Sequence, residues 1–499
     1  MTLADLQNGS DIRGIAITTE DLEKNLGENE AALVANGIVH WLENKGVKKP
    51  FRIGIGHDSR LTGPSLKQAM IDVFGAAGVE VLDFGLATTP ALFMATQFDE
   101  FAVDAGIMLT ASHLPYYFNG IKIFSQTGGA EKEDIAYILA HTESLPSGDG
   151  KVSQADLLSR YAQDLVEKIK AGIDSETDQP LKDFKIIVDA GNGAGGYFAE
   201  KVLAVLGADT TGSQFLEPDG NFPNHIPNPD NKEAMASIKA AVLENEADIG
   251  VIFDTDVDRS AIVSKDGQMI NRNNLIAVLA AIVLQAEPGA TIVTNSPTTD
   301  HLKDFIEAKG GKQYRYISGY RNVINKGMDL NAAGINTPLS IETSGHAAFK
   351  ENYFLDDGAY VIAKILMLLP QLQKDGQTLT DLMAELVQPE ETLEVRFKIA
   401  GEDYKNTGVA MIETFKNELA KVEGFTVNPE NEEGVRFSVS APFGQGWLLL
   451  RMSLHEPLLV LQVENDQAGQ IEKILSILRD ILASDKQIDL TKLDAIIKG

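Results

Sequence analysis

The sequence predicts an α/β protein that ends in a smaller α+β domain, and three observations support this. Short apolar runs alternate with helical stretches along most of the chain, which is typical of α/β domains. Most of these runs are continuously apolar, as expected for strands that are buried on both faces of a mainly parallel sheet. The C-terminal part differs, because several strand-like segments there precede one amphipathic helix.

Apolar runs in the α/β part mark the predicted strands. These strands are Phe51–Gly56, Val79–Gly85, Ala105–Leu109, Lys185–Asp189, Asp248–Phe253, Thr291–Thr294 and Pro338–Ile341. Helical periodicity between them is clearest at Leu157–Ile169 and Asn274–Leu284. The predicted C-terminal strands are Leu393–Ile399, Val435–Val439, Gly446–Ser453 and Pro457–Glu464. The helix that follows them carries Ile471, Ile474, Leu475, Leu478, Ile481 and Leu482 on one face.

The length and charge of the chain limit its possible functions. A chain of 499 residues corresponds to about three or four domains of roughly 100–200 residues each. Polar stretches near 147–153, 264–274 and 388–391 are candidate boundaries. The formal net charge of -29 disfavours nucleic acid as a partner, because such partners require a basic face. A small anionic ligand would need arginines and lysines that gather locally.

Cysteine content and apolar run length indicate a cytoplasmic protein. The chain has no cysteine, which excludes disulfides and thiolate catalysis. Its longest apolar run, Leu275–Leu284, is about half of what a membrane span needs, so no membrane is expected as a partner. Residues Met1–Gly14 lack the basic start and apolar run of a secretory signal.

Three aspartates at every second position form the sharpest local motif. Asp254, Asp256 and Asp258 follow a buried apolar strand directly. If the loop curls, three carboxylates converge on one hard cation such as magnesium, manganese or calcium. Without a cation, carboxylates this close would repel one another and raise each other's pKa. The spacing therefore predicts a metal site.

Two other types of protein share parts of this aspartate motif. A calcium-binding EF-hand loop needs Gly and Glu where this chain has Arg259 and Lys265, so that interpretation fails. Haloacid-dehalogenase-type phosphatases also begin with Asp-x-Asp after an apolar strand. They expect Thr or Val where Asp258 stands, and they remain the weaker alternative.

A second motif, Leu109-Thr110-Ala111-Ser112-His113-Leu114-Pro115, also follows a predicted strand. It places Ser112 at the carboxyl end of the strand, where open α/β sheets bind ligands. A serine needs help to act as a nucleophile, and His113 and Lys122 supply proton transfer and positive charge. Taken alone, the motif fits an exposed turn equally well.

Two further motifs offer groups that bind sugars and phosphates. Ser340-Ile341-Glu342-Thr343-Ser344-Gly345-His346 ends a strand with donors and acceptors for sugar hydroxyls. Arg451 and Ser453 alternate with apolar neighbours, so both point to one side of a strand as a plausible phosphate clamp. Further arginines stand near the starts of strands or loops, at Arg13, Arg60 and Arg321.

These motifs occur together and in order, and the sequence thereby resembles the α-D-phosphohexomutase superfamily, most closely its phosphomannomutase/phosphoglucomutase members. The matching segments are Asp11–Gly14, Asp58–Arg60, Thr110–Pro115, Asn119–Lys122, Asp189–Gly193, Pro218–Pro229, Asp254–Arg259, Glu342–His346 and Arg451–Pro457. The resemblance implies three similar mixed-sheet α/β domains plus a smaller C-terminal α+β domain around a central active-site cleft. With the polar boundaries above, the predicted domains are 1–150, 151–266, 267–388 and 389–499.

The resemblance also implies a role for each loop. Ser112 would be the phosphoserine and a metal ligand, beside a magnesium ion held by Asp254, Asp256 and Asp258. Arg13, Lys122, Arg259 and His113 would surround the transferring phosphoryl group. Substrate contacts would come from Glu342, Ser344, His346, Arg321, Arg451, Ser453 and His455. The expected substrate is a hexose phosphate, the expected activator is a hexose 1,6-bisphosphate, and the expected assembly is a monomer or homodimer.

Several positions depart from the family pattern and keep alternatives open. Leu454 and His455 replace the usual Gly/Asn-Thr pair of the phosphate loop, and Leu114 stands where Asn is usual. The sugar loop also lacks the doubled acid of some members. Besides a mannose or glucose phosphate mutase, the sequence therefore allows a phosphoglucosamine mutase or a phosphoserine-using hydrolase. It also allows a non-catalytic sugar-phosphate-binding protein that retains the fold.

Overall fold

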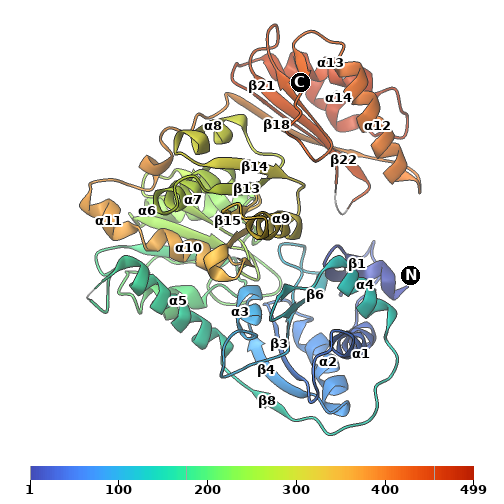
Figure 1. The fold of residues 1–499 in the computed structure, drawn as a ribbon, viewed down its shortest axis with the longest axis vertical. Coiled ribbons are helices and arrows are strands. Elements are labelled where there is room, and N and C mark those ends of the chain that lie inside the picture. The colour runs from blue at the N-terminus through green and yellow to red at the C-terminus, as the bar shows by residue number, and fades with distance from the viewer. Residues whose placement is uncertain (1, 176, 454–455, 499) are drawn as a thin grey trace. The chain divides into compact units, whose positions relative to one another are not determined.

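The computed structural model describes residues 2–175, 177–453 and 456–498, drawn as a ribbon in Figure 1. The chain forms two compact units. The first unit runs to Val278 and also includes Ser344–Asp381, whereas the second comprises Leu279–Thr343 and the chain from Leu382 onward. No helix within the described part of the chain is long and apolar enough to span a membrane.

The N-terminal domain is a mixed sheet with helices on both faces. Its strands, in spatial order, are β1 (Gln7–Asn8), β2 (Asp11–Ile15), β6 (Phe118–Ser125), β5 (Ala105–Leu109), β3 (Arg52–His57), β4 (Glu80–Leu86) and β8 (Val152–Gln154), with β7 (Gly128–Gly129) paired to β6. Its helices are η1 (Leu3–Leu6), α1 (Glu28–Asn44), α2 (Gly63–Ala76), α3 (Thr89–Met94) and α4 (Lys132–Ala140). Helices α1 and α2 pack side by side, as Figure 1 shows.

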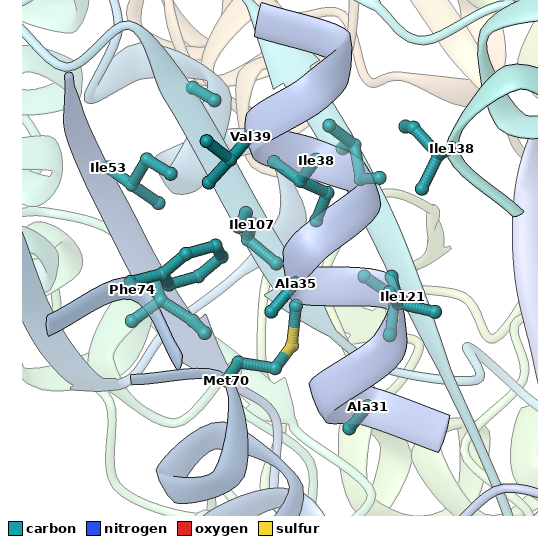
Figure 2. Packing of buried hydrophobic residues seen from close by; sticks show 14 of the residues in the cluster. Ala31, Ala35, Ile38, Val39, Ile53, Met70, Phe74, Ile107, Ile121 and Ile138 are labelled. Carbon is teal, nitrogen blue, oxygen red and sulfur yellow. The ribbon is translucent and has the colours of Figure 1, made fainter. Parts of the chain in front are cut away.

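The core of this domain lies between α1, α2, α4 and one face of the sheet. In Figure 2, Ala35 and Val39 of α1 lie among Ile53, Ile107 and Phe74, all of them buried. Successive strand residues point to opposite faces, so the neighbour of Ile107 faces α3 instead. That neighbour is Gly106, and a Cβ there would lie 2.3 Å from the carbonyl oxygen of Leu92. Only glycine lets α3 approach this closely.

The second domain has a smaller sheet in the order β12-β11-β10-β9. Its elements are α5 (Leu157–Ile173), β9 (Ile186–Asp189), η2 (Phe198–Leu203), α6 (Lys232–Glu244), β10 (Ile249–Phe253), β11 (Ser260–Ser264) and β12 (Met269–Ile270). The first unit also includes a later segment of the chain, whose elements are β16 (Ala347–Phe349), η3 (Lys350–Asn352), β17 (Leu355–Asp356), α10 (Gly358–Leu366) and α11 (Leu369–Lys374). Helix α10 packs on α5, and the Tyr161 hydroxyl donates to the buried Asp357 carboxylate at 2.6 Å.

The prediction of mainly parallel sheets is wrong for these two domains. β6 runs antiparallel to both β5 and β2, and β11 runs antiparallel to both β10 and β12. Both strands are buried along nearly their whole length. The apolar runs of β5 and β10 indicate burial on both faces, but they do not show the direction of the strands β6 and β11 that pair with them. The sheets are mixed, as the resemblance implied.

The second unit begins with the rest of the third α/β domain. Helix α7 (Arg272–Ala286) leads into parallel strands in the order β14-β13-β15, flanked by α8 and α9. These elements are β13 (Thr291–Asn295), α8 (Asp300–Ala308), β14 (Lys312–Tyr316), α9 (Tyr320–Ala332) and β15 (Leu339–Ile341). The 3-10 turn η4 (Thr380–Met383) precedes the C-terminal domain.

The C-terminal domain is an antiparallel sheet in the order β18-β22-β21-β20-β19, with helices on one face (Figure 1). Its elements are β18 (Glu391–Lys398), α12 (Tyr404–Leu419), β19 (Phe425–Val427), β20 (Val435–Val439), β21 (Gly446–Met452), β22 (Leu458–Asn465), α13 (Gln470–Leu482) and α14 (Thr491–Lys498). Phe437 packs with Phe415 and Leu478 of the helices. The predicted strands and helices of both units are confirmed to within a few residues.

The opposite face of the C-terminal sheet carries Arg436, which is fully buried against the third domain. Its guanidinium donates to the carbonyl oxygens of Ser296 and Thr298, both at 3.0 Å, and to Asp300 Oδ1 at 2.9 Å. It also lies 3.8 Å from the ring centroid of Trp447. Burial, together with the charge of Arg315, lowers the pKa of Arg436 to about 9, so the group stays charged at neutral pH.

Replacing Arg436 with Met should strongly destabilise this unit. The variant leaves two carbonyl groups without their donor, and removing one partner of a buried ion pair costs about 3–5 kcal/mol. Calorimetry should show the unfolding transition of the second unit at a clearly lower temperature. Arg396→Met is the matched control, because Arg396 is half exposed on the same sheet. An unchanged transition in Arg436→Met would contradict the role given to Arg436.

Candidate active site

Ser112 lies just beyond the carboxyl end of β5 in a polar, buried setting. Only 2% of the residue is exposed, and its φ of 51° is rare for a residue other than glycine. Its amide donates to Thr110 Oγ1 at 2.9 Å, which fixes the turn. Its hydroxyl donates to Asp254 Oδ2 at 2.9 Å and accepts from Arg259 Nη2 at 3.2 Å. A backbone held in a sparsely populated conformation is typical of functional sites.

A buried arginine holds the loop that carries Ser112. Arg60 Nη2 donates to the carbonyl oxygens of Ser112 at 2.5 Å and Leu114 at 2.6 Å. Its Nη1 donates to the carbonyl oxygens of Pro115 at 2.8 Å and Phe118 at 3.0 Å. Arg60 has no role predicted from the sequence, because a lone arginine after a strand resembles a surface residue. Its function as a loop clamp depends on carbonyls more than fifty residues away in the chain.

The aspartate loop brings its three carboxylates together. Asp254, Asp256 and Asp258 are fully buried, and one oxygen of each lies within 4.8 Å of the others. Val257, with a φ of 66°, turns the chain between them. Asp256 accepts from the Thr89 hydroxyl and Asp258 accepts from Lys122 Nζ. The curled loop matches the geometry that the spacing predicted.

The electrostatics of this cluster favour a bound cation. Burial raises the pKa of Asp254, and the charges of Asp258 and Asp256 raise it further. Burial also acts on Asp258, but Lys122, His346 and Arg259 lower its pKa by more. Among the described residues, Asp256 Oδ1 and Asp258 Oδ1 find no hydrogen-bond donor. Buried, unsatisfied carboxylate oxygens are the ligands that magnesium prefers, so the donor set fits such an ion.

Positive side chains border the same cluster. Lys122 on β6 lies 3.4 Å from Asp256 Oδ2, and Arg259 Nε lies 3.1 Å from Asp254 Oδ2. Arg13 on β2 pairs with Asp11 at 3.0 Å, and its backbone register places it opposite Gly120 of β6. The residues predicted to surround the phosphoryl group therefore come from neighbouring elements of one unit.

Two histidines of the predicted site, His113 and His346, have opposite electrostatic settings. His113 Nδ1 lies 3.3 Å from the Ser112 hydroxyl, and the charge of Arg259, with burial, lowers its pKa. His346 Nδ1 lies 2.5 Å from Asp356 Oδ2 and 4.0 Å from Asp258 Oδ1. Burial opposes the charging of His346, but these carboxylates raise its pKa overall.

Two further side chains of the cluster escaped the sequence analysis. Thr89 and Asp356 lie in segments without a recognisable motif. Two weaker signals were present: Thr89 is a hydroxyl residue that opens a helix after a strand, and Asp356 is followed directly by a second aspartate, Asp357. Thr89 also donates its amide to the carbonyl oxygen of Asp256 at 2.9 Å. It thereby anchors the aspartate loop to the N-terminus of α3.

The remaining predicted substrate contacts are divided between the two units. Glu342 accepts from the Gly319 amide at 2.7 Å, and Arg321 lies in the first turn of α9. Arg451 lies near the end of β21 and Ser453 directly follows that strand, where the Ser453 amide donates to the Leu458 carbonyl at 2.8 Å. Ser344 is the first residue of the segment that returns to the first unit. Leu454 and His455 lie outside the described residues.

Comparison with known proteins decides the family. Models of phosphoglucomutase/phosphomannomutase alpha/beta/alpha domains I, II and III match residues 4–147, 159–267 and 271–389 in that order. The chain belongs to the phosphoglucomutase/phosphomannomutase family. It is an isomerase of this phosphohexomutase type, with three α/β/α domains and a C-terminal antiparallel-sheet domain.

Curated relatives of this family cover nearly the whole chain. The phosphomannomutase/phosphoglucomutase of Pseudomonas putida is 32% identical over 431 residues, which is 86% of this chain and 86% of that protein. The phosphoglucomutase of Neisseria gonorrhoeae is 31% identical over 97% of this chain and 98% of its own length.

Solved structures extend the similarity to the fold. A family protein from Burkholderia thailandensis has a TM-score of 0.78 at 28% identity, covering 97% of this chain and 98% of that one. The N-acetylphosphoglucosamine mutase of Aspergillus fumigatus shares the fold, with a TM-score of 0.54 at 12% identity over 89% of this chain and 80% of that one.

Proposed function

We propose that this phosphohexomutase interconverts the 1-phosphate and 6-phosphate of a hexose, mannose or glucose, through a phosphoserine at Ser112. The observation that carries the proposal is the position of the Ser112 hydroxyl between the Asp254 carboxylate and the Arg259 guanidinium, beside three converging aspartates. A serine oxygen so placed has an acceptor for its proton and a cation for the charge of an attached phosphoryl group.

Transfer from phosphoserine to sugar follows from the same geometry. The bond between phosphorus and Ser112 Oγ breaks as a bond to the free sugar hydroxyl oxygen forms, giving a hexose 1,6-bisphosphate. Lys122 and Arg259 stabilise the charge on the transferring oxygens, which dominates catalysis of a loose transition state. Arg13 adds positive charge, and Arg60 keeps the serine loop in place.

The proton of the attacking hydroxyl needs an acceptor within reach. The charge of Arg259, with burial, lowers the pKa of His113 and thereby favours its neutral, proton-accepting form. We assign the proton to His113, whose Nδ1 lies 3.3 Å from the Ser112 hydroxyl, and a sugar contact to His346, which pairs with Asp356. After the bisphosphate turns around, the serine recovers a phosphoryl group from the other position and the second monophosphate leaves.

Magnesium and the remaining contacts complete the proposal. The A. fumigatus enzyme has been solved with GlcNAc-6P and magnesium. Here Asp254, Asp256 and Asp258, with an oxygen on Ser112, would hold the ion. When bound, magnesium supplies positive charge next to the transferring oxygens. Glu342 and Ser344 would contact sugar hydroxyls. Arg451, Ser453, Arg321 and His455 would hold the non-reacting phosphate in both orientations of the bisphosphate.

We also propose domain limits of 1–150, 151–266, 267–388 and 389–499, a cytoplasmic location, and a monomer or homodimer as the assembly. A hexose 1,6-bisphosphate would serve as the activator that loads Ser112.

A coupled assay tests the proposed function. The purified protein receives magnesium, a trace of glucose 1,6-bisphosphate, and glucose 1-phosphate, mannose 1-phosphate or glucosamine 1-phosphate in parallel. Formation of glucose or mannose 6-phosphate is the expected result, and the ratio of rates gives the sugar preference. Conversion of the glucosamine substrate alone would assign a phosphoglucosamine mutase. Free inorganic phosphate as the main product would contradict the proposal, as would binding without turnover.

A further inference from the structure

A buried glutamate of the C-terminal domain lies between the third domain and Arg451. Glu433 is 7% exposed and precedes β20. Its Oε2 accepts from the hydroxyls of Ser296 and Ser318, the latter at 2.7 Å, and from the Ser318 amide at 3.2 Å. Its Oε1 lies 3.6 Å from Arg451 Nη1. One carboxylate thus binds two strand ends of the third domain and faces the predicted phosphate clamp.

The backbone around Glu433 fixes its position relative to Arg451. β20 and β21 are antiparallel, and Val435 pairs with Leu450. Between Glu433 and Val435, Gly434 adopts a φ of 58°, and a Cβ there would lie 2.2 Å from the Leu450 carbonyl oxygen. The chain before β20 therefore lies directly against the end of β21. This close approach holds Glu433 opposite Arg451.

The contacts of Glu433 continue into the sugar loop. The amides of Ser318 and Gly319 are consecutive, and they donate to Glu433 and Glu342 respectively. Both amides lie at the N-terminus of α9, whose dipole stabilises negative charge. The same turn therefore holds the glutamate beside the clamp arginine and the glutamate expected to contact the sugar.

We propose that Glu433 is a positioning residue that orients Arg451 for the non-reacting phosphate and couples this clamp to Glu342 through Ser318 and Gly319. The proposal rests on the proposed function, since it assumes that Arg451 binds phosphate. Three hydrogen-bond donors offset part of the charge of Glu433, so Glu433 orients Arg451 without neutralising the arginine's charge. Arg451 Nε has no hydrogen-bond partner among the described residues, which leaves that donor for a ligand.

Glu433→Gln tests the proposal with the least change in shape. The amide keeps one acceptor oxygen but loses the charge that orients Arg451. We expect KM for glucose 1-phosphate, or mannose 1-phosphate if preferred, to rise on the order of 10-fold with a much smaller change in kcat, because misplacing a positioning group is costly. Glu430→Gln is the matched control: Glu430 also bonds the third domain, through Lys303 at 2.6 Å, but is more exposed and was assigned no substrate contact.

A double-mutant cycle with Arg451→Ala separates positioning from general stabilisation. If Glu433 acts through Arg451, Glu433→Gln should have no further effect on KM in the Arg451→Ala background. An equal rise in both backgrounds, or an unchanged or lower KM in Glu433→Gln alone, would overturn the proposal. Thermal unfolding of every variant checks that the fold is kept, and Ser318→Ala, which removes one donor to Glu433, should raise KM more weakly.

Failure of the proposed function would look different from failure of this proposal. Absence of turnover in the wild-type protein, or an unchanged KM in Arg451→Ala, would refute the proposed function or its phosphate clamp. If the wild-type protein binds without turnover, calorimetric titration with glucose 1-phosphate gives Kd for the four proteins of the double-mutant cycle. A higher Kd in Glu433→Gln only when Arg451 is present supports the role of Glu433, and any other pattern of Kd values overturns it.

Discussion

Ser112→Ala should abolish turnover and leave the fold intact. The variant removes the oxygen that would carry the phosphoryl group, and loss of a covalent nucleophile costs at least about 1000-fold in rate. The turn should survive, because the Ser112 amide still donates to Thr110 and Arg60 still binds the loop carbonyls. The coupled assay measures the rate, and thermal unfolding measures the fold.

Ser125→Ala is the matched control for this variant. Ser125 ends β6 in the same sheet, and among the described residues its hydroxyl bonds to Thr127 and Gly128 of its own turn. We expect its activity to remain close to that of the wild-type protein. Near wild-type activity in Ser112→Ala would refute the assignment of the nucleophile.

Asp256→Asn should lower activity steeply and weaken the response to magnesium. The exchange removes one negative charge from the three-carboxylate cluster. In the wild-type protein, Asp256 Oδ1 has no hydrogen-bond donor among the described residues. Electrostatic contacts of this kind are each worth about 100–1000-fold in rate. Activity as a function of magnesium concentration should shift to higher concentrations, and calorimetric titration should show weaker binding of the ion without substrate.

Asp266→Asn controls for the general loss of an aspartate. Asp266 lies in the turn after β11 and bonds to Ser264 and Gln268. Its exchange should leave the magnesium titration unchanged. If Asp256→Asn also titrates like the wild-type protein, the cluster is not the magnesium site.

Much of the fold followed from local sequence patterns. β5 and β20 have the limits that the sequence predicts, because β5 is a continuous apolar run, β20 alternates apolar with polar residues, and both are bounded by polar or turn residues. Strand direction could not be predicted in the same way. β6 and β11 return antiparallel, and their direction depends on the connection and partner that each strand finds in the folded chain.

The candidate site was predictable where its residues are close in sequence. Asp254, Asp256 and Asp258 converge within one short loop, so their spacing already carried the geometry. Arg60 and Glu433 act on partners that are distant in the chain, and a lone arginine or glutamate has no local pattern that reports such a contact. Those roles depend on tertiary packing and become visible only in the folded molecule.

Passage of the phosphoryl group through Ser112 can be followed by mass spectrometry of the working enzyme. The protein is incubated with magnesium and glucose 1,6-bisphosphate whose phosphates carry a heavy oxygen isotope, and its peptides are then mapped for phosphate. We expect labelled phosphate on Ser112, and we expect it to be replaced by unlabelled phosphate when excess unlabelled glucose 6-phosphate is added, with the label appearing in glucose 1-phosphate. Turnover with phosphate on a different residue, or with none on Ser112 at any time, would refute the phosphoserine mechanism.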